Sequence, residues 1–360
     1  MTPGRDRESA TCSTHLAAKF VLAAMIGSMG GALFALFRVP LAWMLGSMVA
    51  CTIASMAGAP LAAPKWLRNP LVVTIGILLG SSFSKEFLAD LIQWWPTILG
   101  MLGFLLVGGL ICVLYMRLVA GYDPVTAFFA GMPGGLNDMV ILSEAYEGDA
   151  RIVALTHSTR VLIVVSALPL IMAVVGHVEL VPIGRTMSPL QFSLSGVLWC
   201  IATALVGILI GHLLRLPAKY LLGPMVASAV VHAAGWTSFL LPTQLTSAAQ
   251  VGLGLIIGCR FAGISPLAVL PVLAHSVVIS ILLIAETFLF SFAVGALTGV
   301  PAMQLVLAYS PAGLTEMSLV ALSLHYEVVF VATHHILRIF VVILAAQYLA
   351  ANTLARGRRR

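Results

Sequence analysis

Two short segments combine a proline, glycines and an acid within apolar surroundings. They are residues 133–138 (Pro-Gly-Gly-Leu-Asn-Asp) and residues 311–316 (Pro-Ala-Gly-Leu-Thr-Glu). Proline removes a backbone donor and clashes with the preceding helical turn, whereas glycine tolerates non-helical angles. We therefore expect each segment to form two half-helices around an unwound centre, with the second half beginning near Leu136 or Leu314.

An unwound centre leaves backbone carbonyls and amides free to bind a ligand. Inside a membrane such groups are tolerated only within protein or along a watery cavity. Asp138 and Glu316 fall in the first turn of the second half-helices, where the helix dipole favours an acid. Secondary transporters often bind substrate and coupling ion at discontinuous helices of two repeats. The residues predicted to bind substrate or ion are Pro133, Gly134, Gly135, Asn137, Asp138, Pro311, Gly313, Thr315 and Glu316.

A different interpretation of the same residues is a pair of ordinary turns at the membrane surface. Pro-Gly-Gly followed by Asn-Asp would also suit a helix N-cap. The apolar residues before each break favour an immersed site. Ala312 replaces the glycine found at position 134, so the second break is expected to be tighter than the first.

A histidine and an arginine three residues apart follow each break. They are His157 with Arg160, and His335 with Arg338. Ionisable groups deep in a membrane are costly and usually face the bundle interior, so we expect these pairs to balance charge at the breaks or to contact an anionic substrate. Snorkelling to the interface is the alternative, because their helices are expected to begin near residues 150 and 328.

Glu286 stands alone in the apolar run 279–292. Desolvation favours the protonated form of such a carboxyl, so either neutral packing or a proton-carrying role would fit. His-x-x-Arg is not a metal-binding motif, and no spacing typical of metal ligands accompanies it. We expect no bound metal and no cofactor.

The two breaks belong to a longer internal repeat. Sliding the sequence by 178 positions superimposes Pro133 on Pro311, and His157 and Arg160 on His335 and Arg338. Asp138 aligns with Glu316, so an acidic residue is present at this position in both halves although the residue type differs. The glycine runs 76–80 and 252–258 also correspond in part, and their spacing is typical of closely packed helices.

Composition identifies the solvent of this chain as a lipid bilayer. Of its 360 residues, 60% are hydrophobic and 9% are charged, against about 25% charged in soluble domains. The net charge of +6 comes from scattered helix-end residues and a basic tail, so no nucleic-acid surface is predicted. By the positive-inside rule, the arginines of residues 351–360 indicate a cytoplasmic C-terminus.

The apolar segments predict an all-α polytopic membrane protein. A spanning helix needs about 20 apolar residues. The strong candidates are 17–37, 93–116, 152–175, 190–214, 268–297 and 328–350, and shorter apolar stretches lie at 40–57, 70–83, 217–234 and 247–261. With the broken segments 123–147 and 301–327, ten to twelve crossings in two homologous repeats are expected. The first run should be a membrane helix, not a removed signal peptide.

The expected organisation follows from these boundaries. Residues 1–15 form a polar tail, 16–177 the first membrane repeat and 178–189 a linker. Residues 190–350 form the second membrane repeat and 351–360 a basic tail.

These motifs resemble the bacterial AbrB family of membrane proteins over roughly residues 17–350. The resemblance rests on Arg38-Val-Pro-Leu-Ala-Trp-Met-Leu-Gly46, on the Pro-Gly-Gly-Leu-x-Asp-Met element, and on Pro-Ala-Gly-Leu-Thr-Glu-Met followed by His-His-x-x-Arg. This family shares only its name with the soluble DNA-binding AbrB regulators. The resemblance implies labels such as ammonia monooxygenase and regulator of aidB expression. No ligand set for a copper or iron monooxygenase is evident in the sequence.

The function that we expect from the residues is secondary transport of a small solute in the bacterial inner membrane. The coupling ion would be a proton or Na⁺, bound by Asp138 and Glu316, and a homo-oligomer is compatible with the sequence. The principal alternative is a membrane-bound sensor or regulator of gene expression, and ammonia oxidation is the weaker one. Whether the repeats are inverted depends on whether each broken segment crosses the membrane or turns back.

Overall fold

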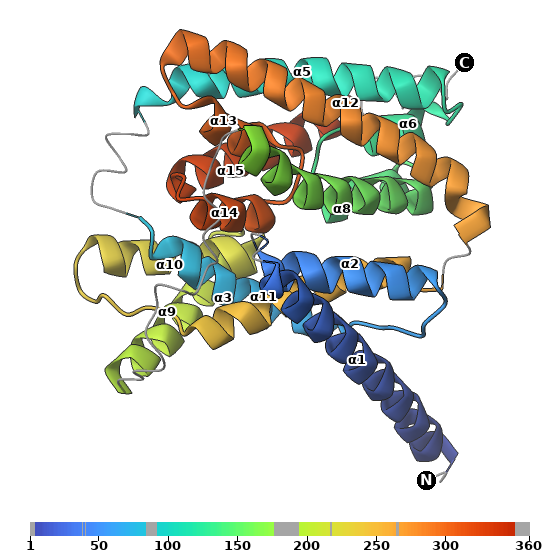
Figure 1. Ribbon diagram of the computed structural model, residues 1–360, viewed down its shortest axis with the longest axis vertical. Helices are drawn as coiled ribbons and strands as arrows, with labels where there is room; N and C mark the ends of the chain where they lie inside the picture. The colour runs from blue at the N-terminus through green and yellow to red at the C-terminus, as the bar shows by residue number, and fades with distance from the viewer. Residues whose placement is uncertain are drawn as a thin grey trace. The chain divides into compact units, whose positions relative to one another are not determined.

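The computed structural model describes residues 4–37, 39, 41–83, 92–175, 194–216, 218–263 and 266–349, and these residues form only helices and connecting turns (Figure 1). The predicted linker 178–189, the basic tail 351–360 and Arg38 lie outside the described residues. The polar N-terminal residues from Gly4 onward belong to the first helix, α1 (Gly4–Leu36).

Six of the described helices are long and apolar enough to cross a membrane. Their candidate spans are Leu16–Leu36, Trp95–Leu118, Ala150–Met172, Leu194–Leu213, Leu270–Thr298 and Val328–Tyr348. Each one coincides with one of the six strong candidates from the sequence, which confirms a multi-pass, all-helical membrane protein. The four shorter apolar stretches are also helical, as α2 (Ala42–Met56), α3 (Arg68–Gly80), α10 (Lys219–Ala233) and α11 (Thr243–Gly258).

The helices group into two compact units, and each unit takes residues from both halves of the chain. Unit 1 comprises residues 1–85 and 180–266, and unit 2 comprises residues 86–179 and 267–360. Neither unit is therefore a continuous stretch of sequence. The broken segments, the histidines and arginines that follow them, and Glu286 all belong to unit 2.

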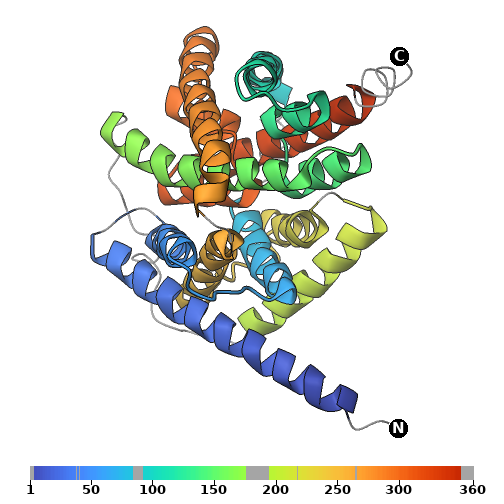
Figure 2. The ribbon, with the colours of Figure 1, turned by 90° about the vertical axis from the view of Figure 1, so that its right-hand side faces the viewer.

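Unit 1 contains α1, α2 and α3 from the first half and α9 (Leu194–Leu213), α10 and α11 from the second. Figure 2 shows α1 and α9 on the outside of this unit, with the four shorter helices between them. The inner helices exchange partners between the halves, since α2 packs against α11 and α3 packs against α10.

Glycines bring these inner helices into backbone contact. A Cβ at Gly76 of α3 would lie 2.5 Å from the carbonyl oxygen of Leu221 on α10. A Cβ at Gly254 of α11 would collide with the carbonyl oxygen of Met44 and lie 2.9 Å from the amide nitrogen of Met48, both on α2. Small residues at helix crossings permit such close packing in membranes, as the glycine spacing predicted.

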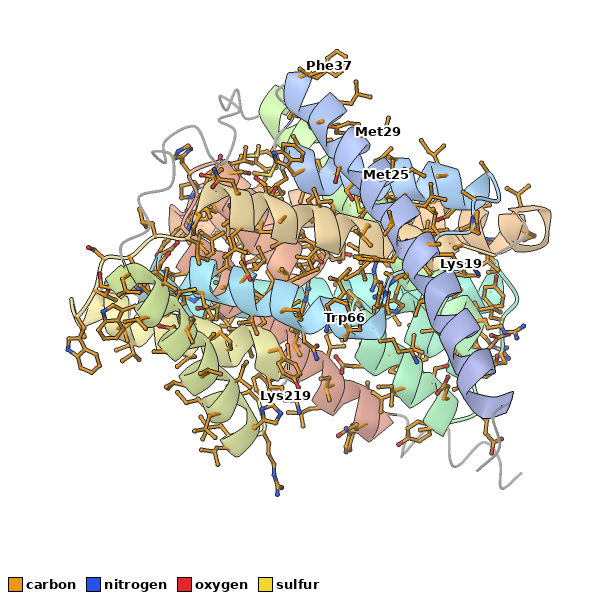
Figure 3. All side chains as sticks on the ribbon, turned by 90° about the horizontal axis from the view of Figure 1, so that it is seen from below. Lys19, Met25, Met29, Phe37, Trp66 and Lys219 are labelled. Carbon is orange, nitrogen blue, oxygen red and sulfur yellow. The ribbon has the colours of Figure 1, made fainter. Side chains whose placement is uncertain are left out.

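Apolar side chains cover the outside of α1. Met25, Met29 and Phe37 are exposed and project away from the helices on which α1 packs (Figure 3). Where lipid is the solvent such a surface has no cost, because lipid tails are as apolar as the side chains themselves.

Unit 2 contains eight described helices. From the first half come α5 (Trp95–Leu118), α6 (Pro124–Gly131), α7 (Leu136–Ala145) and α8 (Ala150–Val175). From the second half come α12 (Pro266–Thr298), α13 (Ala302–Tyr309), α14 (Leu314–Ser323) and α15 (Val328–Leu349). The short helices α6, α7, α13 and α14 pack on the long helices of this unit.

Candidate functional site

Both broken segments contain two half-helices around an unwound centre, as the sequence predicted. In the first, α6 ends at Gly131 and α7 begins at Leu136, and the intervening Met132 has extended backbone angles (φ −60°, ψ 135°). In the second, α13 ends at Tyr309 and α14 begins at Leu314, and Ser310 is extended in the same way (φ −52°, ψ 137°). The expected starts at Leu136 and Leu314 are confirmed.

The first broken segment turns back on itself, and we call residues 123–145 hairpin 1. The backbone amide of Asp149, just before α8, donates to the hydroxyl of Thr126 in the first turn of α6 at 2.8 Å. A Cβ at Gly148 would meet both Ser143 near the end of α7 and Val125 at the start of α6. The start of α6 and the end of α7 therefore lie together, and the unwound centre is the tip of a helical hairpin.

The second broken segment has the same construction, and we call residues 301–323 hairpin 2. The side-chain amide of Gln304, near the start of α13, donates to the carboxylate of Glu327, just before α15, at 3.2 Å. Farther along, Leu307 and Ser310 contact the interior of α15. Helix α13 thus runs alongside α15 from its start, and α14 returns to that start.

A histidine and an arginine of α8 bind the tip of hairpin 1. Arg160 donates to the carbonyl oxygens of Met132 at 3.2 Å and Gly134 at 3.3 Å, and to Nδ1 of His157 at 2.7 Å. Nε2 of His157 bonds the carbonyl oxygen of Phe129 at 2.9 Å. Carbonyls released by the break are therefore satisfied by a guanidinium group, which can donate several bonds in a fixed geometry.

The equivalent pair on α15 binds the tip of hairpin 2 through the same set of bonds. Arg338 donates to the carbonyl oxygens of Ser310 and Ala312 and to Nδ1 of His335. Nε2 of His335 bonds the carbonyl oxygen of Leu307 at 2.9 Å. Every donor and acceptor in this set is displaced by 178 residues from its counterpart in hairpin 1.

These bonds determine the tautomer of both histidines. Arginine can only donate, so Nδ1 of each imidazole must accept, and Nε2 must carry the proton that is donated to the carbonyl. His157 and His335 are consequently neutral in this arrangement. Neither arginine snorkels, since Arg160 is 1% exposed and Arg338 is 4% exposed.

The two tips lie deep within their unit. Arg160 is ten residues beyond the start of α8, and Arg338 is ten residues beyond the start of α15, or about 15 Å along each axis. The two guanidinium groups lie within electrostatic range of each other, and α14 of hairpin 2 packs against α8. Unit 2 therefore brings the two unwound tips into one neighbourhood.

The predicted acids occupy matching positions beside the tips. Asp138 and Glu316 are each the third residue of the returning helix, and the preceding N-cap residue is a glycine in both cases. A Cβ at Gly135 would lie 2.7 Å from Oδ2 of Asp138, and one at Gly313 would collide with Oε2 of Glu316. Each carboxylate thus bends back over its N-cap glycine, as the acid of a capping box does.

The remaining predicted residues are also placed at the tips. Pro133 and Pro311 are buried, and Thr315 is buried in the first turn of α14. The carbonyl of Gly134 accepts from Arg160, so part of the predicted ligand set is occupied by protein. The backbone of Asn137 belongs to the first turn of α7, and its side chain lies outside the described part of the chain.

One polar cluster beside hairpin 2 has no counterpart among the sequence predictions. Nε2 of His334 bonds the hydroxyl of Thr97 on α5 at 2.9 Å, and the hydroxyl of Tyr309 donates to the backbone carbonyl of Thr97 at 2.6 Å. The position that corresponds to His334 in the first half is Thr156, so the repeat itself gave no signal of this cluster.

An aspartate begins hairpin 1. Asp123 caps α6 by accepting the amides of Val125 and Thr126, each at 3.0 Å. Burial alone would raise the pKa of this carboxyl, but hydrogen bonds from the side chain and amide of Thr126 and from the amide of Val125 hold the pKa below the usual 3.8.

Removing this cap should destabilise the protein modestly. We expect Asp123→Ala to lower the free energy of unfolding by about 1 kcal/mol, and Asp123→Asn, which keeps an acceptor, to lower it less. Because the folded-state pKa is depressed, the carboxylate contributes its stabilisation above the unfolded-state pKa and loses it as pH falls through the folded-state value. Thermal unfolding in detergent at neutral and strongly acidic pH measures this; an Asp123→Ala deficit that persists unchanged in acid would contradict it.

Among the described residues, no group of three or more His, Cys, Asp and Glu side chains is placed to hold a metal ion. The groups present at the tips are backbone amides and carbonyls, two carboxylates and two guanidinium groups.

The amino-acid sequence is similar to one family model and to two bacterial proteins. The family model described as "Transition state regulatory protein AbrB" matches residues 43–353. The Bacillus subtilis (strain 168) protein named "Uncharacterized protein YhjN" is 29% identical over 359 residues, covering 88% of this chain and 88% of that protein. The Escherichia coli (strain K12) protein named "Putative regulator AbrB" is 27% identical over 326 residues, covering 88% of this chain and 91% of that protein. Because the family model spans most of a chain whose helices are long and apolar enough to cross a membrane, this protein belongs to the AbrB family of integral membrane proteins.

Proposed function

We propose that this protein is a secondary transporter of a small solute, with its binding site at the tips of the two hairpins. The observation that carries the proposal is the pair of helical hairpins whose unwound tips lie deep inside one apolar helical unit. Non-helical backbone is costly inside a membrane and is tolerated where it is buried in protein or lines a cavity. Two such tips, each bound by a buried Arg–His pair, are a costly construction for a purely structural role.

The groups at the tips suit a site with two kinds of ligand. The returning helices α7 and α14 begin at the tips, so their amide ends favour an anionic group of the solute. Asp138 and Glu316 lie beside those ends and would bind a cation, either a proton or Na⁺. Arg160 and Arg338 keep the tip carbonyls in place and would balance the carboxylates.

We also propose that the two halves are homologous repeats of opposite orientation. The displacement of equivalent hydrogen bonds by 178 residues supports the duplication. If a hairpin returns to its own side, five described helices of each half would cross the membrane, which are α1, α2, α3, α5 and α8 in the first half. An odd number of crossings inverts the second half relative to the first. The protein would lie in the bacterial cytoplasmic membrane with its C-terminus inside.

Reconstituted protein tests the transport proposal. A panel of small organic acids, amines and amino acids would be offered to proteoliposomes with an imposed pH or Na⁺ gradient. Wild-type protein should accumulate at least one solute, and Asp138→Asn or Glu316→Gln should reduce the rate at least tenfold. Glu144→Gln, an exposed carboxylate on α7, is the matched control and should transport normally. A wild-type protein that moves no solute of the panel under any gradient contradicts the proposal.

The second candidate is a membrane-bound regulator of gene expression, and the name of the Escherichia coli relative, "Putative regulator AbrB", favours it. This role would need a surface that reports to a cytoplasmic partner. If deleting the gene changes transcription while Asp138→Asn leaves that response intact, the regulator is favoured over the transporter. If Asp138→Asn changes transcription as much as deletion of the gene does, regulation follows from transport.

A further inference from the structure

Helices α5 and α12 pack side by side in unit 2 in antiparallel directions (Figure 1). Phe104 stacks edge-on against Phe290 with ring centroids 6.0 Å apart, and one end of the pair is joined by a 3.0 Å bond between the Tyr115 hydroxyl and Nδ1 of His275. At the other end, a Cβ at Gly100 would lie 2.6 Å from Cγ2 of Val294, so the two helices are close there as well. This register places the carboxyl of Glu286 opposite Gly108.

Glu286 enters the helix pair only because residue 108 has no side chain. A Cβ at Gly108 would collide with Oε2 of Glu286 and lie 3.1 Å from Oε1. The side chain of Glu286 is 8% exposed, and its Oε1 has no hydrogen-bond partner within the described part of the chain. A buried carboxylate normally accepts bonds at both oxygens, so this group is incompletely satisfied.

The titratable groups that face Glu286 are few. Cys112, one turn beyond Gly108 on α5, lies within electrostatic range of both Glu286 and Arg160 of α8. Arg160 itself is bound to the tip of hairpin 1, and among the described residues its Nε has no hydrogen-bond partner. Cys112 is thus within electrostatic range of both incompletely satisfied groups, the carboxyl of Glu286 and the guanidinium group of Arg160.

The carboxyl of Glu286 is unusual because it lies far from the end of a helix that is long and apolar enough to cross a membrane. Glu286 is the only Asp or Glu within the six candidate spans of the described residues. It is twelve residues, or about 18 Å, from the Thr298 end of its helix. A lone charge at such depth is costly, and ionisable residues there commonly serve proton or ion pathways.

We propose that Glu286 also binds and releases a proton, and that this proton is coupled to the transport proposed above in addition to the cation at Asp138 and Glu316. When a proton from water forms the O–H bond of the carboxyl, the group is neutral and can remain between α5 and α12. When that bond breaks and the proton returns to water, a carboxylate is left that is attracted toward Arg160 and the tip of hairpin 1. No electrons are transferred, and the proposal rests on the proposed function for its coupling step.

Reaction with a carbodiimide tests proton binding without knowledge of the solute. Dicyclohexylcarbodiimide is apolar and adds to protonated carboxyls in membranes, leaving a stable adduct that mass spectrometry locates. We expect Glu286 to be labelled at mildly acidic pH, labelling to fall several-fold at alkaline pH, and Glu286→Gln to lose it. The exposed Glu144 should remain unlabelled. A Glu286 that never reacts, or that reacts equally at every pH, overturns the proton site.

Solute exchange separates coupling from transport itself. With a solute that the wild-type protein accumulates, Glu286→Gln should lose accumulation driven by a pH gradient at least tenfold and retain exchange of labelled for unlabelled solute. Equal accumulation by wild type and Glu286→Gln overturns the coupling role. If the wild-type protein moves no solute, the transport proposal and the coupling role both fail, whereas labelling still decides whether Glu286 exchanges a proton.

Discussion

Replacing Arg338 with alanine is expected to lower the free energy of unfolding by about 3–6 kcal/mol. The change removes the donor of two carbonyl oxygens, those of Ser310 and Ala312, in a fully buried setting. Hydrogen bonds to charged groups contribute about 1.5–3 kcal/mol each, and the carbonyls left behind have no water to replace the guanidinium group. Thermal unfolding of purified protein in detergent, with the yield of monodisperse protein, measures the loss.

Matched variants identify the cause of that loss. Arg338→Lys keeps the charge but cannot bond both carbonyls in the geometry of a guanidinium group, so an intermediate loss is expected. Arg160→Ala should act in the same direction at hairpin 1. Arg151, an exposed arginine in the first turn of α8, is the control, and Arg151→Ala should change stability by less than about 0.5 kcal/mol. If Arg338→Ala is as stable as Arg151→Ala, the arginines do not support the hairpin tips.

The second large effect is expected at the helix crossings of unit 1. Gly254→Ala should destabilise unit 1 by about 3 kcal/mol or more, because its Cβ would meet backbone atoms of Met44 and Met48 that cannot move without separating α11 from α2. Loss of folded protein, measured by size-exclusion chromatography and thermal unfolding, is the expected result.

The same helix contains a control for this substitution. Gly252 also lies in α11, but a Cβ there would meet the methyl groups of Leu71, a flexible side chain that can adopt another rotamer. We expect Gly252→Ala to be milder than Gly254→Ala by at least about 1.5 kcal/mol. Equal effects at both positions would mean that helix propensity or local crowding, and not the crossing with α2, determines stability.

Much of the fold could be predicted from the sequence because its signals are local. The length of the apolar runs located the six spans, and a proline within two residues of a glycine located both breaks, with helices α7 and α14 beginning at Leu136 and Leu314. Each of these features depends on a residue and its immediate neighbours, which composition and spacing record directly.

The path of each broken segment could not be predicted, because it depends on contacts between helices. Helix α7 folds back toward the start of α6, where the amide of Asp149 bonds the hydroxyl of Thr126. The periodicity of the sequence does not encode this contact. The partners of Arg160 and Arg338 were uncertain for the same reason. The sequence is compatible with charge balance at the breaks, contact with an anionic substrate or snorkelling, whereas the structure places both guanidinium groups on carbonyls of the breaks.

The sequence also gave no indication that the compact units would interleave the halves. The repeat predicts two similar stretches, 16–177 and 190–350, and similarity alone does not reveal whether a stretch packs with itself or with its copy. Gly76 and Gly254 predicted close packing but not its partners, which proved to be helices of the other half.

The exchange of helices in unit 1 has a consequence for biogenesis. The hydroxyl of Ser47 on α2 donates to the carbonyl of Val251 on α11, a residue that lies 204 positions later in the chain. At a synthesis rate of about 5–20 residues per second, roughly 10–40 s pass between the synthesis of α2 and that of its partner α11. During that interval the newly inserted helices present glycine-lined surfaces without their final neighbours, so the nascent protein is open to membrane proteases and chaperones until α11 is synthesised.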